Sequence, residues 1–127
     1  MTSTIKVKSV YEPADDEDGT RILVDRLWPR GVTKEKLGIE YWSKAIAPST
    51  ELRKWYGHDP EKWEEFCERY RRELDDNPEG VQELLHHLKS SVATFLFSSK
   101  EHRLNNAVAL RDYLQQTHPK SIKKSRV

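Results

Sequence analysis

A short apolar run, Ile22 to Val24, constrains the fold of this chain more than any other feature. Such a run between turn residues is typical of a strand that is buried on both faces of a parallel sheet. The residues directly after it bring a carboxylate, two guanidinium groups, an indole and a glycine together: Asp25, Arg26, Trp28, Arg30 and Gly31. In open α/β sheets, ligands bind beyond the carboxyl ends of the strands. We therefore expect a ligand site at the end of this strand.

The rest of the chain alternates strand-like and helix-like segments. Residues 4–10 alternate apolar and basic side chains, residues 91–98 form a second apolar run, and residues 44–47 are a candidate for a short additional strand. Connections between parallel strands are long enough to hold helices and are right-handed. We therefore expect an α/β fold, a single-domain three-layer sandwich with a small, mainly parallel sheet and helices on both faces.

Helix starts are marked by capping residues. Asp59 and Asn77 each precede a proline and a glutamate, which is the pattern of an N-cap followed by the first helical turn. Thr33 and Ser49 can cap two shorter helices in the same way. A last helix is expected from about Glu101 to Gln116.

Length and composition favour one cytoplasmic domain. The 127 residues suit a single domain, which we place at residues 1–117. Residues 118–127 carry four basic residues and no acid, so we expect a disordered tail and a slightly acidic body. No apolar run approaches the ~20 residues of a membrane span, and the amino terminus lacks the pattern of a signal peptide. The single cysteine, Cys67, excludes an internal disulfide.

Two further clusters can contribute to the same site. Ser98 and Lys100 follow the late strand and Asn105 lies in the next helix, while Lys44, Ser49 and Arg53 lie around the 50–56 helix. Parallel strands end at one edge of a sheet, and arginine forks and helix starts both bind anions. The candidate ligand-binding residues are Arg26, Trp28, Arg30, Gly31, Lys44, Ser49, Arg53, Ser98, Lys100 and Asn105.

Several other chemistries are not indicated. Cys67 lies on the apolar stripe of a predicted helix, where a cysteine behaves as a small hydrophobic residue. Glycine-rich motifs for dinucleotides or triphosphates are absent, and the five histidines do not form a metal-binding pattern. We expect no metal and no cofactor.

Several specific motifs carry a resemblance to a known family: LVDRLWPRG at 23–31, W-x-K-x-I-A-P-S at 42–49, T-E-L-R-K at 50–54, E-F-x-x-x-Y-x-x-E-L at 65–74 and S-x-K at 98–100. With these motifs the chain resembles the YeaO-like branch of the domain-of-unknown-function 488 (DUF488) family from Ile5 to Leu114. The family has no established biochemical activity, so the resemblance implies a fold and the position of a site but no reaction. Other branches carry a cysteine near the position of Ser98, and its absence here argues against thiol chemistry.

The leading functional prediction is that the carboxyl edge of the sheet binds a small anionic ligand. This ligand is a molecule with a phosphate or carboxylate group, or a nucleotide. If a reaction follows binding, hydrolysis or group transfer is the expected class and Asp25 is the candidate base. The alternative is a nucleic-acid-associated module that uses the basic tail and the Arg/Trp cluster. The sequence indicates neither the ligand nor the oligomeric state.

Overall fold

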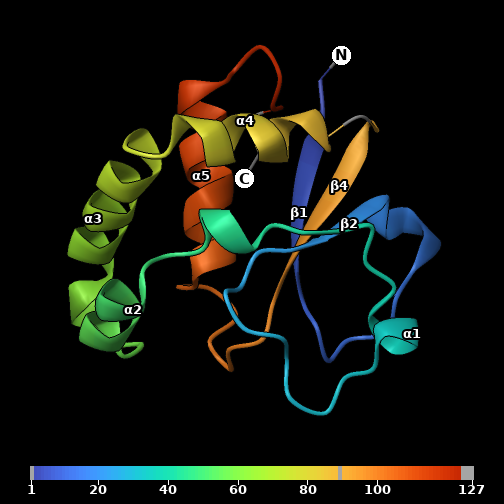
Figure 1. Ribbon diagram of the computed structural model, residues 1–127, viewed down its shortest axis with the longest axis horizontal. Coiled ribbons are helices and arrows are strands. Elements are labelled where there is room, and N and C mark those ends of the chain that lie inside the picture. The colour runs from blue at the N-terminus through green and yellow to red at the C-terminus, as the bar shows by residue number, and fades with distance from the viewer. Residues whose placement is uncertain (1, 89, 124–127) are drawn as a thin grey trace.

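The computed structural model describes residues 2–88 and 90–123, and at its centre is a parallel sheet of four strands. The strands are β1 (Thr4–Ser9), β2 (Thr20–Leu23), β3 (Tyr41–Trp42) and β4 (Val92–Phe97), in the spatial order β1-β4-β2-β3 (Figure 1). β4 pairs with both β1 and β2, so the last strand of the sequence lies between the first two. The predicted α/β fold with a parallel sheet is confirmed.

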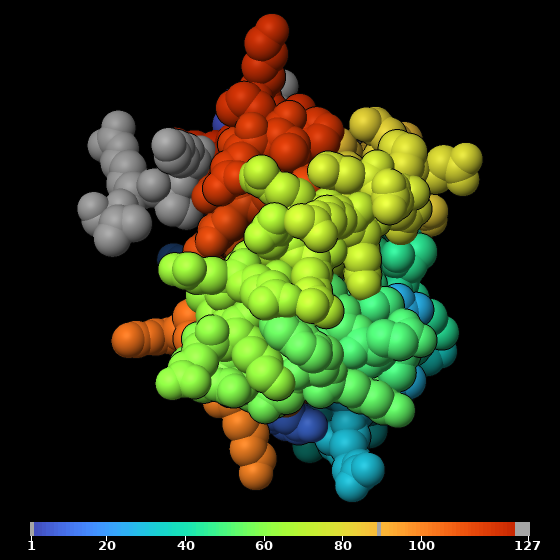
Figure 2. All heavy atoms as spheres, turned by 90° about the vertical axis from the view of Figure 1, so that its left-hand side faces the viewer, coloured from blue at the N-terminus to red at the C-terminus, as the bar shows by residue number. Residues whose placement is uncertain are grey.

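Four of the helices cover one face of the sheet. They are α2 (Thr50–Tyr56), α3 (Trp63–Asp75), α4 (Pro78–His86) and α5 (Asn106–Thr117). Alternate strand residues point toward them, and Ile22, Phe95 and Phe97 pack with Phe66 and Leu110 in the main core. In Figure 2, α3 in lime lies across the middle of this helical face and α4 in yellow lies at its upper right. Within residues 2–88 and 90–123, no helix is long and apolar enough to cross a membrane.

The opposite face of the sheet has a thinner cover. It consists of α1 (Lys34–Leu37), the 3-10 turn η1 (Asp16–Asp18) and the chain between β2 and β3. Leu23 and Leu96 pack with Leu37 there in a second, smaller core. The three layers are therefore unequal, because in the described part of the chain one face has four helices, whereas the other has only the four-residue α1 and the 3-10 turn η1.

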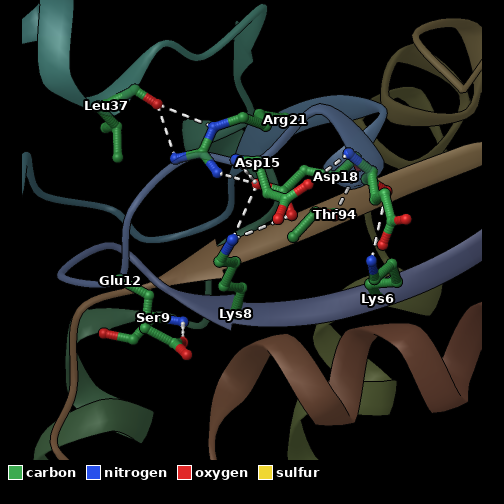
Figure 3. Close-up of polar contacts among 10 residues, drawn as sticks. Lys6, Lys8, Ser9, Glu12, Asp15, Asp18, Arg21, Leu37 and Thr94 are labelled. Atoms are coloured by element: carbon green, nitrogen blue, oxygen red, sulfur yellow. Dashed lines mark hydrogen bonds and ion pairs between the residues drawn. The ribbon is translucent and has the colours of Figure 1, made fainter.

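A buried ion cluster holds η1 on this second face (Figure 3). The Asp18 carboxylate lies 2.5 Å from Arg21 Nη1 and 3.1 Å from Lys8 Nζ, and the side chains of Asp18 and Arg21 are 2% and 7% exposed. Arg21 also donates two hydrogen bonds to the Leu37 carbonyl, which ties α1 to the same cluster.

Gly19, directly after η1, has φ +64°, and a Cβ there would lie 2.1 Å from the Val92 carbonyl oxygen. Only glycine allows η1 to approach the sheet this closely.

The predicted helix starts are confirmed at four caps. The side chains of Thr33, Ser49, Asp59 and Asn77 each accept a hydrogen bond from a backbone N–H in the first turn that follows. After Asp59 the chain begins as the 3-10 turn η3 (Pro60–Lys62) and continues into α3.

Two predicted boundaries differ in the structure. The strand expected at residues 44–47 is wrong, because Ile22 and Leu23 pair with Tyr41 and Trp42 instead, and Lys44–Ile46 forms the 3-10 turn η2. The last helix begins at Asn106 instead of Glu101. The Glu101 carboxylate accepts hydrogen bonds from the backbone N–H groups of Arg103 and Leu104, which fixes residues 101–104 as a bend.

The first part of the predicted disordered tail is packed. Ile122 is buried and forms a parallel bridge with Ser3, and Lys123 N donates to the Ser3 carbonyl oxygen. The chain reverses after α5 because Ser121 N and Ile122 N both donate to the His118 carbonyl. A single apolar residue, Ile122, is thus enough to anchor this segment beside the start of β1. Residues 124–127 of the predicted tail lie outside the described residues.

Candidate functional site

A cavity of about 330 Å³ opens at the carboxyl edge of the sheet. The chain segments that follow β1, β2 and β4 line it, together with α2 and the start of α5. Of the predicted site residues, the cavity brings together Asp25, Arg26, Trp28, Arg30, Arg53, Ser98 and Asn105. This is the position that the topology of a parallel sheet favours for a ligand.

Asp25 organises the floor of this cavity. Its Oδ2 accepts hydrogen bonds from Ser98 N at 2.9 Å and from Ser98 Oγ at 2.6 Å, and its Oδ1 accepts one from Asn106 Nδ2 at 3.0 Å. The carboxylate therefore joins the ends of β2 and β4 to the first turn of α5. Three donors occupy both oxygens, which suits a positioning role better than that of a general base.

Arg26 and Trp28 form the walls and are held by backbone carbonyls. Arg26 donates to the carbonyl oxygens of Ala47 and Pro48 at 3.1 and 3.3 Å. Trp28 Nε1 donates to the Val32 carbonyl at 2.7 Å, and its ring meets the edge of Trp42 at a centroid distance of 5.5 Å. These bonds fix both side chains and satisfy much of their donor capacity.

Two other arginines are available to a ligand. Arg30 and Arg53 are exposed residues that line the cavity, and within residues 2–88 and 90–123 neither forms an ion pair or a side-chain hydrogen bond. His58, with φ +58°, adds an imidazole to the same lining. The one carboxylate of the lining is Asp25, so cationic groups predominate in this cavity.

A buried tyrosine supports the back of the cavity. Tyr56 donates its hydroxyl hydrogen to the Leu104 carbonyl at 2.7 Å. Burial, together with the nearby Glu101 carboxylate, raises the pKa of Tyr56 to about 12, so the phenol stays neutral at ordinary pH. It connects α2 to the bend before α5 and so fixes two walls of the cavity relative to each other.

Four predicted site residues do not line the cavity. Gly31 occupies a turn with φ +78°, and Lys100 is exposed. Lys44 lies over the Trp42 ring, with Nζ 4.2 Å from its centroid. Ser49 caps α2 and is bound by Glu73, which accepts from Ser49 N at 2.8 Å and from Ser49 Oγ at 2.6 Å.

Asn105 lines the cavity but serves mainly as a helix cap. It is 1% exposed, its Oδ1 accepts from Val108 N, and its Nδ2 donates to the Glu101 carbonyl. The neighbouring Asn106 bonds to Asp25 instead. Reasoning from sequence placed one of these two asparagines in the pocket, and the structure places both there with different roles.

Several lining residues lie outside the set of candidate site residues chosen from the sequence. They include Tyr11, Leu27, His58, Ser99 and Asn106. Tyr11 follows β1, and since β1 is parallel to β2 and β4, the rule that located Asp25 and Ser98 could also have located it.

The described residues contain no group of three or more histidine, cysteine or acidic side chains that could hold a metal ion. Cys67 is half-buried on α3 and lines a different hollow between α3 and α5. Burial, with Asp112 and Glu64 nearby, raises the pKa of this thiol to about 11. A protonated thiol is a poor nucleophile, so Cys67 is unsuited to thiol catalysis.

Fold and site together define a small parallel α/β protein with an arginine-rich cavity at the carboxyl edge of its sheet. Residues 4–126 match the DUF488-N3i family, described as "Inactive DUF488-N3 subclade". The chain belongs to the DUF488 family, in its YeaO-like branch.

The relatives confirm this assignment over most of the chain. It is 42% identical over 111 residues to "Uncharacterized protein YeaO" of Escherichia coli (strain K12), which covers 87% of this chain and 96% of that protein. It is 40% identical over 110 residues to "Uncharacterized protein Rv3073c" of Mycobacterium tuberculosis (strain ATCC 25618 / H37Rv), covering 87% and 92%. "Uncharacterized protein Mb3100c" of Mycobacterium bovis matches to the same extent. No solved structure matches the chain.

Proposed function

We propose that this protein binds a small ligand bearing a phosphate or carboxylate group in the cavity at the carboxyl edge of its sheet. The observation that carries the proposal is the pair Arg30 and Arg53, which line one cavity without a carboxylate partner among the described residues. A guanidinium group offers a planar set of donors that matches a carboxylate or a phosphate.

Binding without turnover is better supported than hydrolysis or group transfer. Both oxygens of Asp25, the candidate base, already accept hydrogen bonds from Ser98 and Asn106. The thiol of Cys67 lines a different hollow, between α3 and α5. The description of the matching subclade as inactive agrees with a protein that recognises a ligand and leaves it unchanged.

The alternative, a nucleic-acid-associated module, has less support. It requires the basic tail and the Arg/Trp cluster to act together, but Ile122 packs beside Ser3 at the start of β1, whereas the cavity lies beyond the strand ends. A six-residue strand such as β1 separates these positions by about 20 Å. A cytoplasmic location remains a prediction from the single cysteine.

A ligand screen with matched variants tests the proposal. The melting temperature of the purified chain is measured with phosphate, sulfate, sugar phosphates, nucleotides and carboxylates. A ligand that binds only the native state stabilises it, by about 2.7 kcal/mol at 100 times its Kd. We expect stabilisation by at least one class of anion.

Arg30→Ala and Arg53→Ala should each weaken binding by about tenfold to a hundredfold, because each removes charge-assisted hydrogen bonds of about 1.5–3 kcal/mol. Lys54→Ala is the control, since Lys54 is exposed on the same helix and does not line the cavity. The proposal would be refuted if no anion stabilises the protein. It would also be refuted if Lys54→Ala abolishes the stabilisation by an anion as strongly as Arg53→Ala does.

A further inference from the structure

We propose that the ligand of this cavity joins its anionic group to a planar ring, as a nucleoside monophosphate does. This inference rests on the proposed function and adds the second half of the ligand. It comes from a part of the cavity that the arginines do not explain, its exposed apolar rim.

The rim consists of Tyr11 and Leu27. These are the two large hydrophobic side chains that the described residues leave exposed, at 58% and 60%. Isolated exposed apolar side chains are common and need no explanation. Here, however, both line the same cavity, although they come from different loops. Two apolar side chains at the mouth of one cationic cavity indicate that a ligand covers them.

Tyr11 is held next to the arginine that we expect to bind the anion. Its hydroxyl donates a hydrogen bond to the carbonyl oxygen of Arg30 at 3.0 Å. This bond sets the position of the tyrosine ring relative to the Arg30 backbone, from which the exposed guanidinium group extends. A ligand whose anion contacts Arg30 would place an attached ring against Tyr11, where stacking of planar rings is favourable.

The volume of the cavity agrees with a ligand larger than a simple oxyanion. The volume of about 330 Å³ is room for several water molecules. Inorganic phosphate would fill a small part of this space, and the rest would remain hydrated. Cavities of about 300 Å³ and above are the size class that encloses organic ligands.

An amide oxygen adds a polar acceptor to the lining. Asn106 Nδ2 donates to the Val24 carbonyl at 3.2 Å and to Asp25 Oδ1 at 3.0 Å, and both partners are acceptors, which fixes the orientation of the amide. The Asn106 Oδ1 atom accepts no hydrogen bond within residues 2–88 and 90–123. A sugar hydroxyl or a ring amine would donate a hydrogen bond to it, whereas a fully ionised oxyanion has no hydrogen to donate.

Calorimetric titration of four ligands separates these contributions. The probes are AMP, ribose 5-phosphate, phenyl phosphate and inorganic phosphate, which share the anion and differ in the ring and the sugar. We expect AMP to bind at least tenfold tighter than ribose 5-phosphate, and phenyl phosphate to bind tighter than inorganic phosphate. If AMP binds much more tightly than phenyl phosphate, the ligand is a nucleotide. If AMP and phenyl phosphate bind with equal affinity, and both bind more tightly than the other two probes, the ligand is an aryl anion.

Two variants of Tyr11 test the role of the ring. Loss of one stacked aromatic weakens binding by about 5- to 150-fold, so Tyr11→Ala should lower AMP affinity to that of ribose 5-phosphate. The same variant should leave inorganic phosphate affinity unchanged. Tyr11→Phe removes the bond to Arg30 but keeps the ring, and it should retain most of the preference for AMP. Melting temperatures establish that both variants fold.

The possible failures are distinguishable. If all four probes bind equally and Tyr11→Ala changes none of them, the inference about the ring is wrong while anion binding stands. If Arg30→Ala leaves the affinity for inorganic phosphate unchanged, the proposed function fails and the inference fails with it. If none of the four phosphate probes binds, the inference is wrong, and the carboxylates of the melting-temperature screen then decide whether the proposed function stands.

Discussion

Replacing Asp18 by asparagine should destabilise the protein by about 3 kcal/mol. Asp18→Asn keeps the size of the side chain and removes the negative charge that faces Arg21 at 2.5 Å. Both partners are buried, and removing one partner of a buried ion pair costs about 3–5 kcal/mol. We expect a value near 3 kcal/mol, because Arg21 keeps its two hydrogen bonds to the Leu37 carbonyl and Lys8 reaches water.

This loss is measured by urea unfolding of Asp18→Asn and of the parent chain. For a chain of this length, 3 kcal/mol corresponds to a fall of about 12 °C in melting temperature. Asp16→Asn is the control, since Asp16 is exposed in the same turn, and it should change stability by less than about 0.5 kcal/mol. A loss below about 1 kcal/mol for Asp18→Asn, with an unchanged urea slope, would refute the reasoning.

The difference in stability between the parent chain and Asp18→Asn should depend on pH in a defined way. Burial alone would raise the pKa of Asp18, but hydrogen bonds from Asp15 N, Lys8 and Arg21 outweigh it and lower the pKa below its ordinary value. A carboxylate with a lowered folded-state pKa stabilises the native state above its unfolded pKa of about 3.9, and this stabilisation is lost as pH falls through the folded value. The difference between parent and Asp18→Asn should therefore be constant above about pH 5 and shrink below about pH 4.

Two further predictions concern the site and the cysteine. Asp25→Ala removes the acceptor of the Ser98 N–H and one of the two acceptors of the Asn106 amide, which should cost about 2 kcal/mol in urea unfolding and speed hydrogen exchange of the Ser98 amide. Unchanged exchange would contradict the positioning role. The Cys67 thiol, with its pKa raised to about 11, should react with a disulfide reagent far more slowly at pH 8 in the native state than in urea, and the native rate should rise with pH toward 11. Equal rates in both states would show that the thiol is not buried as described.

Local features of the fold were predictable from the sequence because they depend on neighbouring residues. The caps at Thr33 and Asn77 use side chains that bond within their own first turn. The strand at Ile22 and the charged residues after it predicted the edge of the sheet at which the cavity lies. Parallel pairing alone then brought Asp25 and Ser98 together, although 73 residues separate them.

The remaining features depend on contacts that no local pattern records. The short strand β3 is set by pairing with β2, so the apolar residues at 44–47 were misleading. Ile122 is one apolar residue in a basic segment, and its burial depends on the position of Ser3. Glu101 ends up bonding its own loop instead of starting a helix. Ser49 and Lys44 are fixed by Glu73 and Trp42, which remove them from the cavity.

The position of β4 between β1 and β2 has a consequence for synthesis on the ribosome. Thr4 of β1 pairs with Val92 of β4, so about 88 further residues must be synthesised after the start of β1 before its partner strand begins. Until then β1 and β2 have no strand between them, and the nascent chain exposes strand edges and the apolar side chains meant for both cores. Such intermediates are prone to aggregation. A chain cut before residue 92 thus lacks the strand that unites the sheet, whereas the full chain can close both cores in one late, cooperative step.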